Sequence, residues 1–260
     1  MIRSIWIVVQ ILFFAQIIFA QKQYQLAPPL AGFASVFFDK NTTLSLEFNQ
    51  PGSSIRCTTD GSEPVATSQL YQEPLIISQN SIIIKAKSFA TGFIPSETIA
   101  FQFFSKGKPI ANISSSAPSP KYAGNGSSTL IDNKSGGTNH GNHAWLGFDS
   151  DSVVFNLFLE KGTGVSKVLL HGLNNQGAWI FPPARVDVYS VEENTTLLLK
   201  SQSFKTIKES TTEAKPLWID LPATTVKQLR MVVFPLAALP DWHPGKGSKA
   251  WLFMDEIKLY

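Results

Sequence analysis

The stretch VSKVLLHGLNNQGAWIFPPARVDVYSV, residues Val165–Val191, indicates the fold most directly. Its two ends, Val165–Leu173 and Ala184–Val191, are short runs rich in valine and leucine, whereas its middle is rich in Asn, Gly and Pro. Branched and large apolar residues favour strands, and Asn, Gly and Pro favour turns. The stretch therefore predicts two strands joined by a loop, without a helical period.

The same pattern recurs along the chain. Regularly spaced apolar runs between turn residues are typical of antiparallel sandwiches or barrels, and several of these runs are apolar on both faces, as in strands packed into a core. The sequence therefore predicts an all-β fold built from β-sandwiches. The further runs are TTLSLEF (Thr42–Phe48), SIIIKAKSF (Ser81–Phe89), SVVFNLFL (Ser152–Leu159), TTLLLKSQSF (Thr195–Phe204), KQLRMVVF (Lys227–Phe234) and KAWLFMDEIKLY (Lys249–Tyr260).

The first 20 residues, MIRSIWIVVQILFFAQIIFA, predict export. One arginine precedes an apolar run from Ile5 to Ala20 that is broken only by two glutamines. The run is shorter than the roughly 20 residues that cross a bilayer, so we expect a signal peptide, residues 1–20, rather than a membrane anchor. The mature chain is expected to be secreted, in a periplasm or at a cell surface, without a membrane span. The single cysteine, Cys57, cannot form an internal disulfide, so the domains must rely on packed cores.

Composition divides the chain and excludes one class of partner. Residues 105–121 are rich in small residues and prolines, which predicts a linker between a first domain, residues 21–104, and a second, residues 122–260. The net charge is +3, only 16% of residues are charged, and there is no basic patch with interleaved aromatics. Nucleic acid is therefore not an expected partner.

The first domain carries a recognisable turn and strand pattern. In SIRCTTDGSEPVATSQLYQEPLIISQNSIIIKAKSF, residues Ser54–Phe89, Asp60 and Gly61 form a tight-turn signal and Pro64 marks a second turn. From Gly52 to Phe104 the chain resembles the C-terminal sandwich of chitobiases and related hexosaminidases. This resemblance implies an accessory, immunoglobulin-like sandwich without catalytic residues.

The second domain resembles another sandwich family. Three pieces carry the match in the expected order: T-L-I-D-N followed by A-W-L-G-F, then Q-G-A-W-I-F-P-P, then D-W-H-P-G followed by K-A-W-L-F-M-D-E-I. They are similar to the discoidin-type (coagulation factor 5/8 type C) domain, whose carbohydrate-binding members are often attached to bacterial glycoside hydrolases. The resemblance implies a discoidin-like jelly roll that binds glycans. The whole chain is thus similar to the accessory C-terminal region of a bacterial chitobiase or β-hexosaminidase.

The aromatic residues of the second domain fall into two groups. Trp179 and Trp242 stand beside turn residues, where a tryptophan either presents its face to the C–H face of a sugar ring or folds back and caps the sandwich. We expect the loops that carry them to meet at one end and to hold a terminal hexose or N-acetylhexosamine. The candidate ligand-binding residues are Trp242, His243, Trp179, His140, Asn142 and His143. The expected core aromatics, in apolar strand contexts, are Trp145, Phe148, Trp251 and Phe253.

A calcium ion is the cofactor that the second resemblance implies. Asp132 and Glu256 occupy the positions that match the family's oxygen ligands, which suit calcium. However, the sequence Asp132-Asn133-Lys134 replaces an acid-rich turn, and this lowers the negative charge available to a cation. His140 and His143 are three residues apart, but they lie in a Gly/Asn-rich loop without cysteine, so zinc is not expected. His171, inside an apolar run, is expected to be a hydrogen-bonded structural residue.

The sequence does not predict an enzyme. Asp241 and His243 flank Trp242 without an apparent serine, cysteine or metal partner, and no hydrolase or nucleotide-binding motif is present. Asp255 and Glu256 are adjacent on an expected strand, so their side chains are expected to point to opposite faces. The prediction is a secreted, non-catalytic carbohydrate-binding protein. Two alternatives remain open: an adhesion or scaffold protein that binds another protein, and an accessory subunit of a separately encoded glycoside hydrolase.

Overall fold

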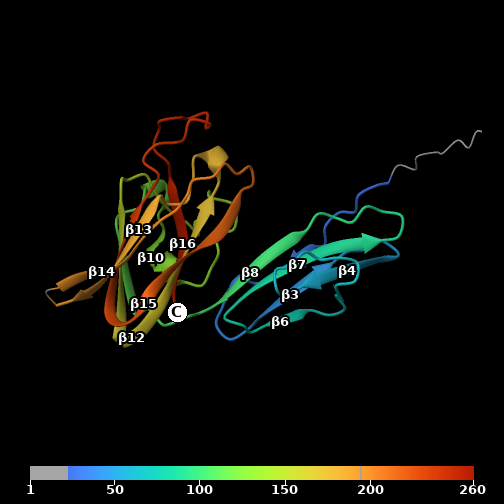
Figure 1. Ribbon diagram of the computed structural model, residues 1–260, viewed down its shortest axis with the longest axis horizontal. Coiled ribbons are helices and arrows are strands. Elements are labelled where there is room, and N and C mark those ends of the chain that lie inside the picture. The colour runs from blue at the N-terminus through green and yellow to red at the C-terminus, as the bar shows by residue number, and fades with distance from the viewer. Residues whose placement is uncertain (1–22, 194) are drawn as a thin grey trace, which may run out of the picture.

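The computed structural model describes residues 23–193 and 195–260, which form two β-sandwich domains (Figure 1). The predicted signal peptide, residues 1–20, lies outside the described residues. In the described part of the chain, no helix is long and apolar enough to cross a membrane. Three short 3₁₀ helices are the only helices there, so the all-β prediction is confirmed: they are η1 (Pro120–Tyr122), η2 (Ser128–Ile131) and η3 (Gln176–Ala178).

The first domain is built from β1 (Leu30–Gly32), β2 (Phe37–Phe38), β3 (Thr42–Glu47), β4 (Ser53–Thr58), β5 (Gln69–Leu70), β6 (Leu75–Ile77), β7 (Ser81–Ala90) and β8 (Ile99–Ser105). One sheet has the order β1-β3-β6 and the other has the order β2-β8-β7-β4-β5. Burial alternates along β3 because successive side chains point to opposite faces of a strand. Leu44, Ile84 and Phe103 therefore meet in the core between the sheets. Gly61 has a φ of 78°, as the predicted Asp60-Gly61 turn requires.

The second domain contains β9 (Asn112–Ser115), β10 (Gly124–Ser127), β11 (Leu146–Phe148), β12 (Val153–Asn174), β13 (Arg185–Glu192), β14 (Thr195–Ser203), β15 (Glu213–Phe234) and β16 (Leu252–Leu259). The two long strands, β12 and β15, pair antiparallel along most of their length, with register shifts between Phe158 and Thr163 and between Val165 and Lys167. At these shifts the pair bends, so each long strand belongs to both layers of the sandwich.

The two layers follow from the register. The first half of β12 pairs with β9 and with the second half of β15, which continues to β13 and β14. The second half of β12 pairs with β16, which continues to β11. Apolar side chains from both layers fill the space between them, including Phe155, Val168 and Ile257. Trp145, Phe148 and Phe253 are buried as predicted, whereas Trp251 is half-buried.

The connection between the domains is shorter than predicted. Residues 112–115, inside the expected linker 105–121, form β9 and pair with β12. Ile113 explains the difference, because its buried side chain joins the core of the second domain and Ile110 packs against that core. Composition alone favoured a linker because these two isoleucines are isolated among small polar residues. Only residues 106–111 separate β8 from β9.

The two domains contact each other directly beside this connection. The Tyr260 hydroxyl donates to the Ser105 carbonyl at 2.9 Å, and the Lys108 N–H donates to the Leu259 carbonyl at 2.7 Å. Phe37 and Phe104 of the first domain pack with Leu169 of the second in one buried cluster, which Trp218 and Tyr260 extend. The last strand of the chain is therefore held against the end of β8.

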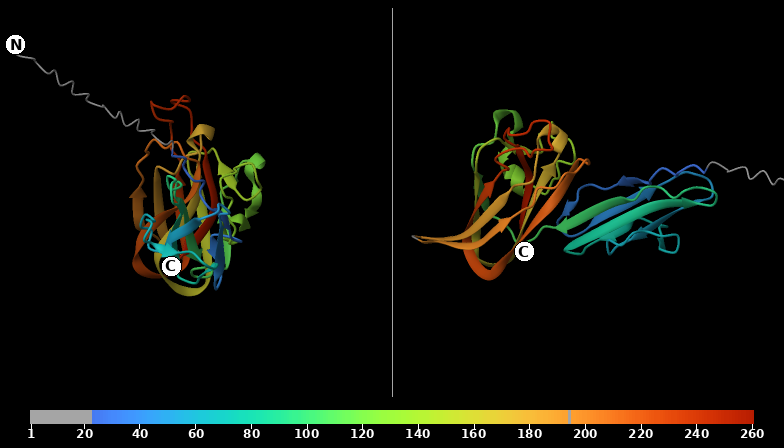
Figure 2. Two further views of the ribbon diagram at one scale, coloured as in Figure 1. Left: turned by 90° about the vertical axis from the view of Figure 1, so that its right-hand side faces the viewer. Right: turned by 45° about the horizontal axis from the view of Figure 1, so that its top comes forward.

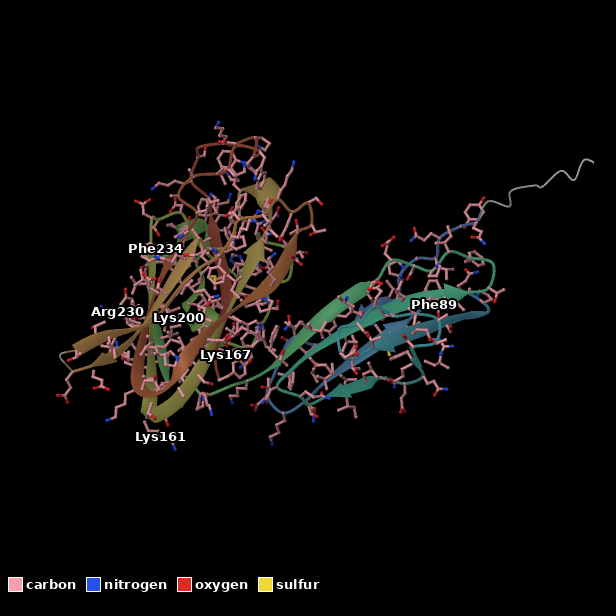
Figure 3. The ribbon with its side chains drawn as sticks, viewed as in Figure 1. Phe89, Lys161, Lys167, Lys200, Arg230 and Phe234 are labelled. Carbon is pink, nitrogen blue, oxygen red and sulfur yellow. The ribbon has the colours of Figure 1, made fainter. Side chains whose placement is uncertain are left out.

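The second sandwich has two distinct ends. Lys161, at the bend of β12, marks one end (Figure 3). The loop before β16, red in the drawing, and the turn at η3 project together from the opposite end (Figure 1). A second view shows the same loop and turn side by side (Figure 2). These two segments, which are far apart in the sequence, are therefore candidates for one site.

Candidate functional site

Gln176 joins these two segments to a third, the loop before β15. Its side-chain amide donates to the Ile207 carbonyl at 2.8 Å and accepts from the Glu209 N–H at 2.9 Å. Its own carbonyl accepts from the His243 Nε2–H at 2.8 Å. Gln176 is itself buried, and its hydrogen bond to His243 is shielded from water. The loops around η3, before β15 and before β16 are thereby fixed relative to one another.

We call the surface formed by Trp179 and Trp242, with His243 between them, the rim. His243 is a structural residue of this rim, and its ring nitrogens are already engaged within the protein. Its side chain is buried, and its Nδ1 accepts from the Gly245 N–H at 3.0 Å while its Nε2 donates to Gln176. Both ring nitrogens are occupied, which also fixes the tautomer with the proton on Nε2. His243 therefore positions the residues beside it, and the prediction that it contacts a ligand remains a prediction.

Two tryptophans flank His243 and reach the surface. Trp242 is 37% exposed and Trp179 is 40% exposed. Their ring centroids lie 6.0 Å and 6.1 Å from the His243 ring, and Phe181 packs beneath at 5.6 Å from the same ring. Each indole therefore rests on a buried aromatic base while part of its surface stays open to solvent.

The backbone at Trp179 is unusual. Its φ is 65°, in the left-handed region that residues with a side chain rarely adopt. Two hydrogen bonds hold it there: the Trp179 N–H donates to the Gln176 carbonyl at 3.0 Å, and the Trp251 N–H donates to the Trp179 carbonyl at 2.8 Å. The structure thus maintains a conformation that costs about 1–3 kcal/mol at an exposed aromatic residue.

Charged side chains surround Trp242. Lys208 Nζ lies 5.9 Å from the centroid of the Trp242 ring, and Asp241 forms an exposed ion pair with Lys246 at 3.0 Å. These groups can donate and accept hydrogen bonds next to the apolar face of the indole. The sequence did not indicate Lys208 or Gln176, because a lysine and a glutamine in separate loops carry no spacing that links them to Trp242.

The loop that carries His140, Asn142 and His143 forms a separate group. Asn142 stabilises its own loop, because its Nδ2 donates to the Gly136 carbonyl at 2.8 Å. His143 is exposed. The ring of His140 packs edge-on against Tyr122, with ring centroids 6.2 Å apart. In residues 23–193 and 195–260, no hydrogen bond, ion pair or ring contact joins these three residues to Trp179 or Trp242. The predicted ligand set is thus divided into two places.

Asp255 and Glu256 anchor the beginning of that loop. Asp255 Oδ2 accepts from the Gly136 N–H at 2.8 Å, and Glu256 Oε2 accepts from the Asn133 N–H at 2.7 Å. The expectation that adjacent strand residues point apart is wrong here because β16 bulges: Met254 pairs with Gly172 and Glu256 pairs with His171, which leaves Asp255 as an extra residue. Both carboxylates are completely buried.

Lys258 occupies the position that a cation would take beside Glu256. Its Nζ lies 3.0 Å from Glu256 Oε1 and donates to Asn133 Oδ1, inside the same buried cluster. Burial raises the pKa of Glu256 to about 8, and the Lys258 ammonium opposes that rise. Asp132, whose pKa is also raised by burial, accepts from the Lys134 N–H at 2.9 Å. The predicted calcium ligands, Asp132 and Glu256, therefore do not fit a metal ion, because Lys258 supplies the positive charge beside them.

The described residues contain no group of three or more His, Cys, Asp or Glu side chains suited to a metal ion. His171 is a buried, hydrogen-bonded residue, as predicted, since its Nδ1 lies 2.6 Å from Asp255 Oδ1. The chemistry of the rim is therefore that of two indoles, hydrogen-bonding side chains and surface charges.

Comparisons with known proteins match one family model over part of the chain and several solved structures. The family model described as the chitobiase/beta-hexosaminidase C-terminal domain matches residues 34–100. Comparison with curated proteins gives no match. Similar solved structures include the CBM32 of AlyQ in complex with 4,5-unsaturated mannuronic acid, at 14% identity and a TM-score of 0.37, with 59% of this chain and 96% of that chain covered.

Two further structures are similar to the chain. One is a CBM32 from Clostridium perfringens in complex with GalNAc-β-1,3-galactose, at 12% identity and a TM-score of 0.40, with 57% of this chain and 94% of that chain covered. The other is the lectin domain of lectinolysin complexed with Lewis B antigen, at 16% identity and a TM-score of 0.39, with 60% of this chain and 94% of that chain covered. Over residues 34–100 the chain is similar to the chitobiase/beta-hexosaminidase C-terminal domain, which confirms the resemblance expected from its turn and strand pattern.

Proposed function

We propose that this protein is a secreted, non-catalytic carbohydrate-binding protein whose ligand rests on the rim formed by Trp179 and Trp242. One observation carries the proposal: two partly exposed indoles from different loops share a single buried support, His243. Exposed tryptophans that a fold holds rigidly provide flat apolar surfaces at low entropic cost. Such a surface matches the C–H face of a pyranose ring.

The polar groups around the indoles suit the remaining faces of a sugar. Lys208 and Lys246 donate hydrogen bonds, and the Asp241 carboxylate accepts them. These side chains are exposed, so each contact with a hydroxyl competes with water. Binding at this open rim is therefore expected to be weak, with a Kd between about 1 μM and 1 mM.

Asp241, Asp255 and Glu256 do not support a hydrolytic role. Cleavage of a glycosidic bond commonly requires two carboxyl groups on either side of the bond. Asp255 and Glu256 are completely buried, and Asp241 is an exposed residue paired with Lys246. His243 has both nitrogens engaged and cannot transfer a proton without losing a structural hydrogen bond. These arrangements support a binding protein.

A glycan array with the full mature chain tests this function. We expect retention of at least one glycan that ends in a hexose or N-acetylhexosamine, and a weaker signal from that glycan in the Trp242→Ala variant. An array without retained glycans would contradict carbohydrate binding and favour a protein partner for the same rim. Release of sugar from a retained glycan during prolonged incubation would contradict the non-catalytic role.

A further inference from the structure

A cavity of about 600 Å³ lies between the two domains, apart from the rim tryptophans. The first domain contributes residues 33–36 and part of β8, and the second contributes residues 134–138, His171 and residues 212–216. This volume is within the range of about 300–1,000 Å³ that is typical of small-molecule sites. The cavity exists only because the two domains contact each other.

His171 presents an acceptor at the wall of this cavity. Its side chain is 3% exposed, and its Nδ1 lies 2.6 Å from Asp255 Oδ1. The carboxylate of Asp255 only accepts hydrogen bonds, so the proton of the neutral imidazole lies on Nδ1 and Nε2 retains its lone pair. Within the described parts of the chain, no hydrogen bond engages Nε2, and His171 lines the cavity. This nitrogen is therefore available to a donor group of a ligand in the cavity.

The orientation of this imidazole is fixed from three sides. Asp255 is itself held by the Gly136 N–H at 2.8 Å. The rings of Phe37 and Phe104 meet the His171 ring edge-on, with centroids 5.0 Å and 6.2 Å away. The acceptor is therefore preorganised and needs no rearrangement to bind a donor.

Part of the cavity lining is aromatic. Phe33 is 37% exposed and packs edge-on against Phe101 and Phe103, with ring centroids 5.1 Å and 5.3 Å away. Among the lining residues, Lys134 and Glu213 carry opposite charges, so the cavity favours neither anions nor cations. An apolar ring face, a fixed acceptor and balanced charge together select a neutral ligand that has both hydroxyl groups and an apolar face.

We propose that this interdomain cavity is a second carbohydrate site, specific for neutral sugars. The His171 Nε2 accepts a hydrogen bond from a ligand hydroxyl, and Phe33 contacts the C–H face of a sugar ring. This site does not depend on the rim, so one chain presents two sugar-binding surfaces. A glycan long enough to reach both would bind more tightly than either site alone provides.

Nitrogen NMR of the histidine-labelled full chain tests the proposal. Cellobiose, lactose and N,N′-diacetylchitobiose are the probes, and the His171 signals are assigned by their absence in His171→Asn. We expect at least one probe to shift the His171 Nε2 resonance saturably. Phe33→Ala should raise the Kd at His171 at least tenfold, whereas Trp242→Ala should leave it unchanged.

A matched control separates loss of the site from loss of the fold. Phe93 has the same exposed fraction as Phe33, 37%, and lies in the same domain outside the cavity lining, so Phe93→Ala should retain the shift. Circular dichroism establishes that both variants are folded. The absence of a saturable His171 shift with all three probes, or an unchanged Kd in folded Phe33→Ala, would overturn the second site without affecting the rim.

Discussion

The Nε2 of His243 lies 2.8 Å from the carbonyl oxygen of Gln176, and this hydrogen bond ties the loop of Trp242 to the loop of Trp179. The same carbonyl accepts the Trp179 N–H at 3.0 Å. While both bonds persist, the loops that carry the two tryptophans are held together. His243 thus supports the proposed binding surface.

Replacement of His243 by alanine should destabilise the protein. The change leaves the Gly245 N–H and one acceptor position of Gln176 without their partner and removes the ring beneath both indoles. We expect the free energy of unfolding to fall by about 1–3 kcal/mol, measured by urea unfolding. His143→Ala replaces an exposed histidine and should stay within about 0.5 kcal/mol of wild type. Equal stability of the two variants would show that His243 is not a support.

Gly245 provides a steric test of the position of Trp179. A Cβ at this glycine would lie 2.7 Å from Trp179 Cζ2 and 3.1 Å from Leu239 Cδ1. Gly245→Ala should therefore displace the indole, weaken sugar binding and cost about 1–3 kcal/mol of stability. At Gly177 in η3, the nearest atom to an added Cβ is Asn175 Oδ1 at 3.7 Å, so Gly177→Ala is the matched control. Calorimetric titration of both variants should find weaker binding only in Gly245→Ala.

The ion pair of Glu256 and Lys258 makes calcium unnecessary. We expect the Tm of the wild-type protein to be unchanged by excess calcium or by chelator, because the Lys258 ammonium already lies 3.0 Å from Glu256 Oε1. Lys258→Met should leave the buried Glu256 carboxyl without its partner and lower stability by about 3–5 kcal/mol. Differential scanning calorimetry measures both effects. A Tm that falls in chelator would show that a metal ion, not the lysine, stabilises this cluster.

Tyr260 should make stability depend on alkaline pH. Burial raises its pKa to about 12, and the nearby Glu256 adds to this rise. Well below pH 10, the Tyr260 phenol is neutral in both the folded and the unfolded state. As pH rises from about 10 to 12, it ionises more readily in the unfolded chain, so the folded state is progressively destabilised.

Urea unfolding at pH 9 and pH 11 measures this loss. Between these pH values the free energy of unfolding should fall less in Tyr260→Phe than in wild type, because the contribution of Tyr260 is removed. The control variant, Tyr189→Phe, should show the same fall as wild type. The same decrease in Tyr260→Phe and in wild type would contradict the assignment.

Much of the fold could be predicted because strand patterns are local. Alternating apolar residues and turn signals identify the strands, and Asp60-Gly61 indicates its turn from two residues alone. β9 was missed because Ile113 becomes apolar core only when β12 lies beside it. The bulge at Asp255 was also missed, because an extra residue in a strand changes which face a side chain reaches without changing the apolar pattern.

The candidate site could be predicted only in part. Trp179 and Trp242 stand out because a tryptophan beside turn residues is unusual, and both reach the surface. Whether His243 faces solvent or a neighbouring loop depends on Gln176, which is 67 residues away in the sequence. The position of Lys258 beside Glu256 likewise depends on how the strand packs against Asn133.

Calorimetric titration of a glycan retained on the array into Trp242→Ala and Phe93→Ala tests the central claim most directly. The two aromatic residues have the same exposed fraction, 37%, but only Trp242 lies on the rim. We predict that Phe93→Ala binds as wild type does and that Trp242→Ala loses about 2 kcal/mol, roughly a 25-fold higher Kd. Unchanged affinity in a folded Trp242→Ala protein would contradict the assignment of this rim as the carbohydrate-binding site.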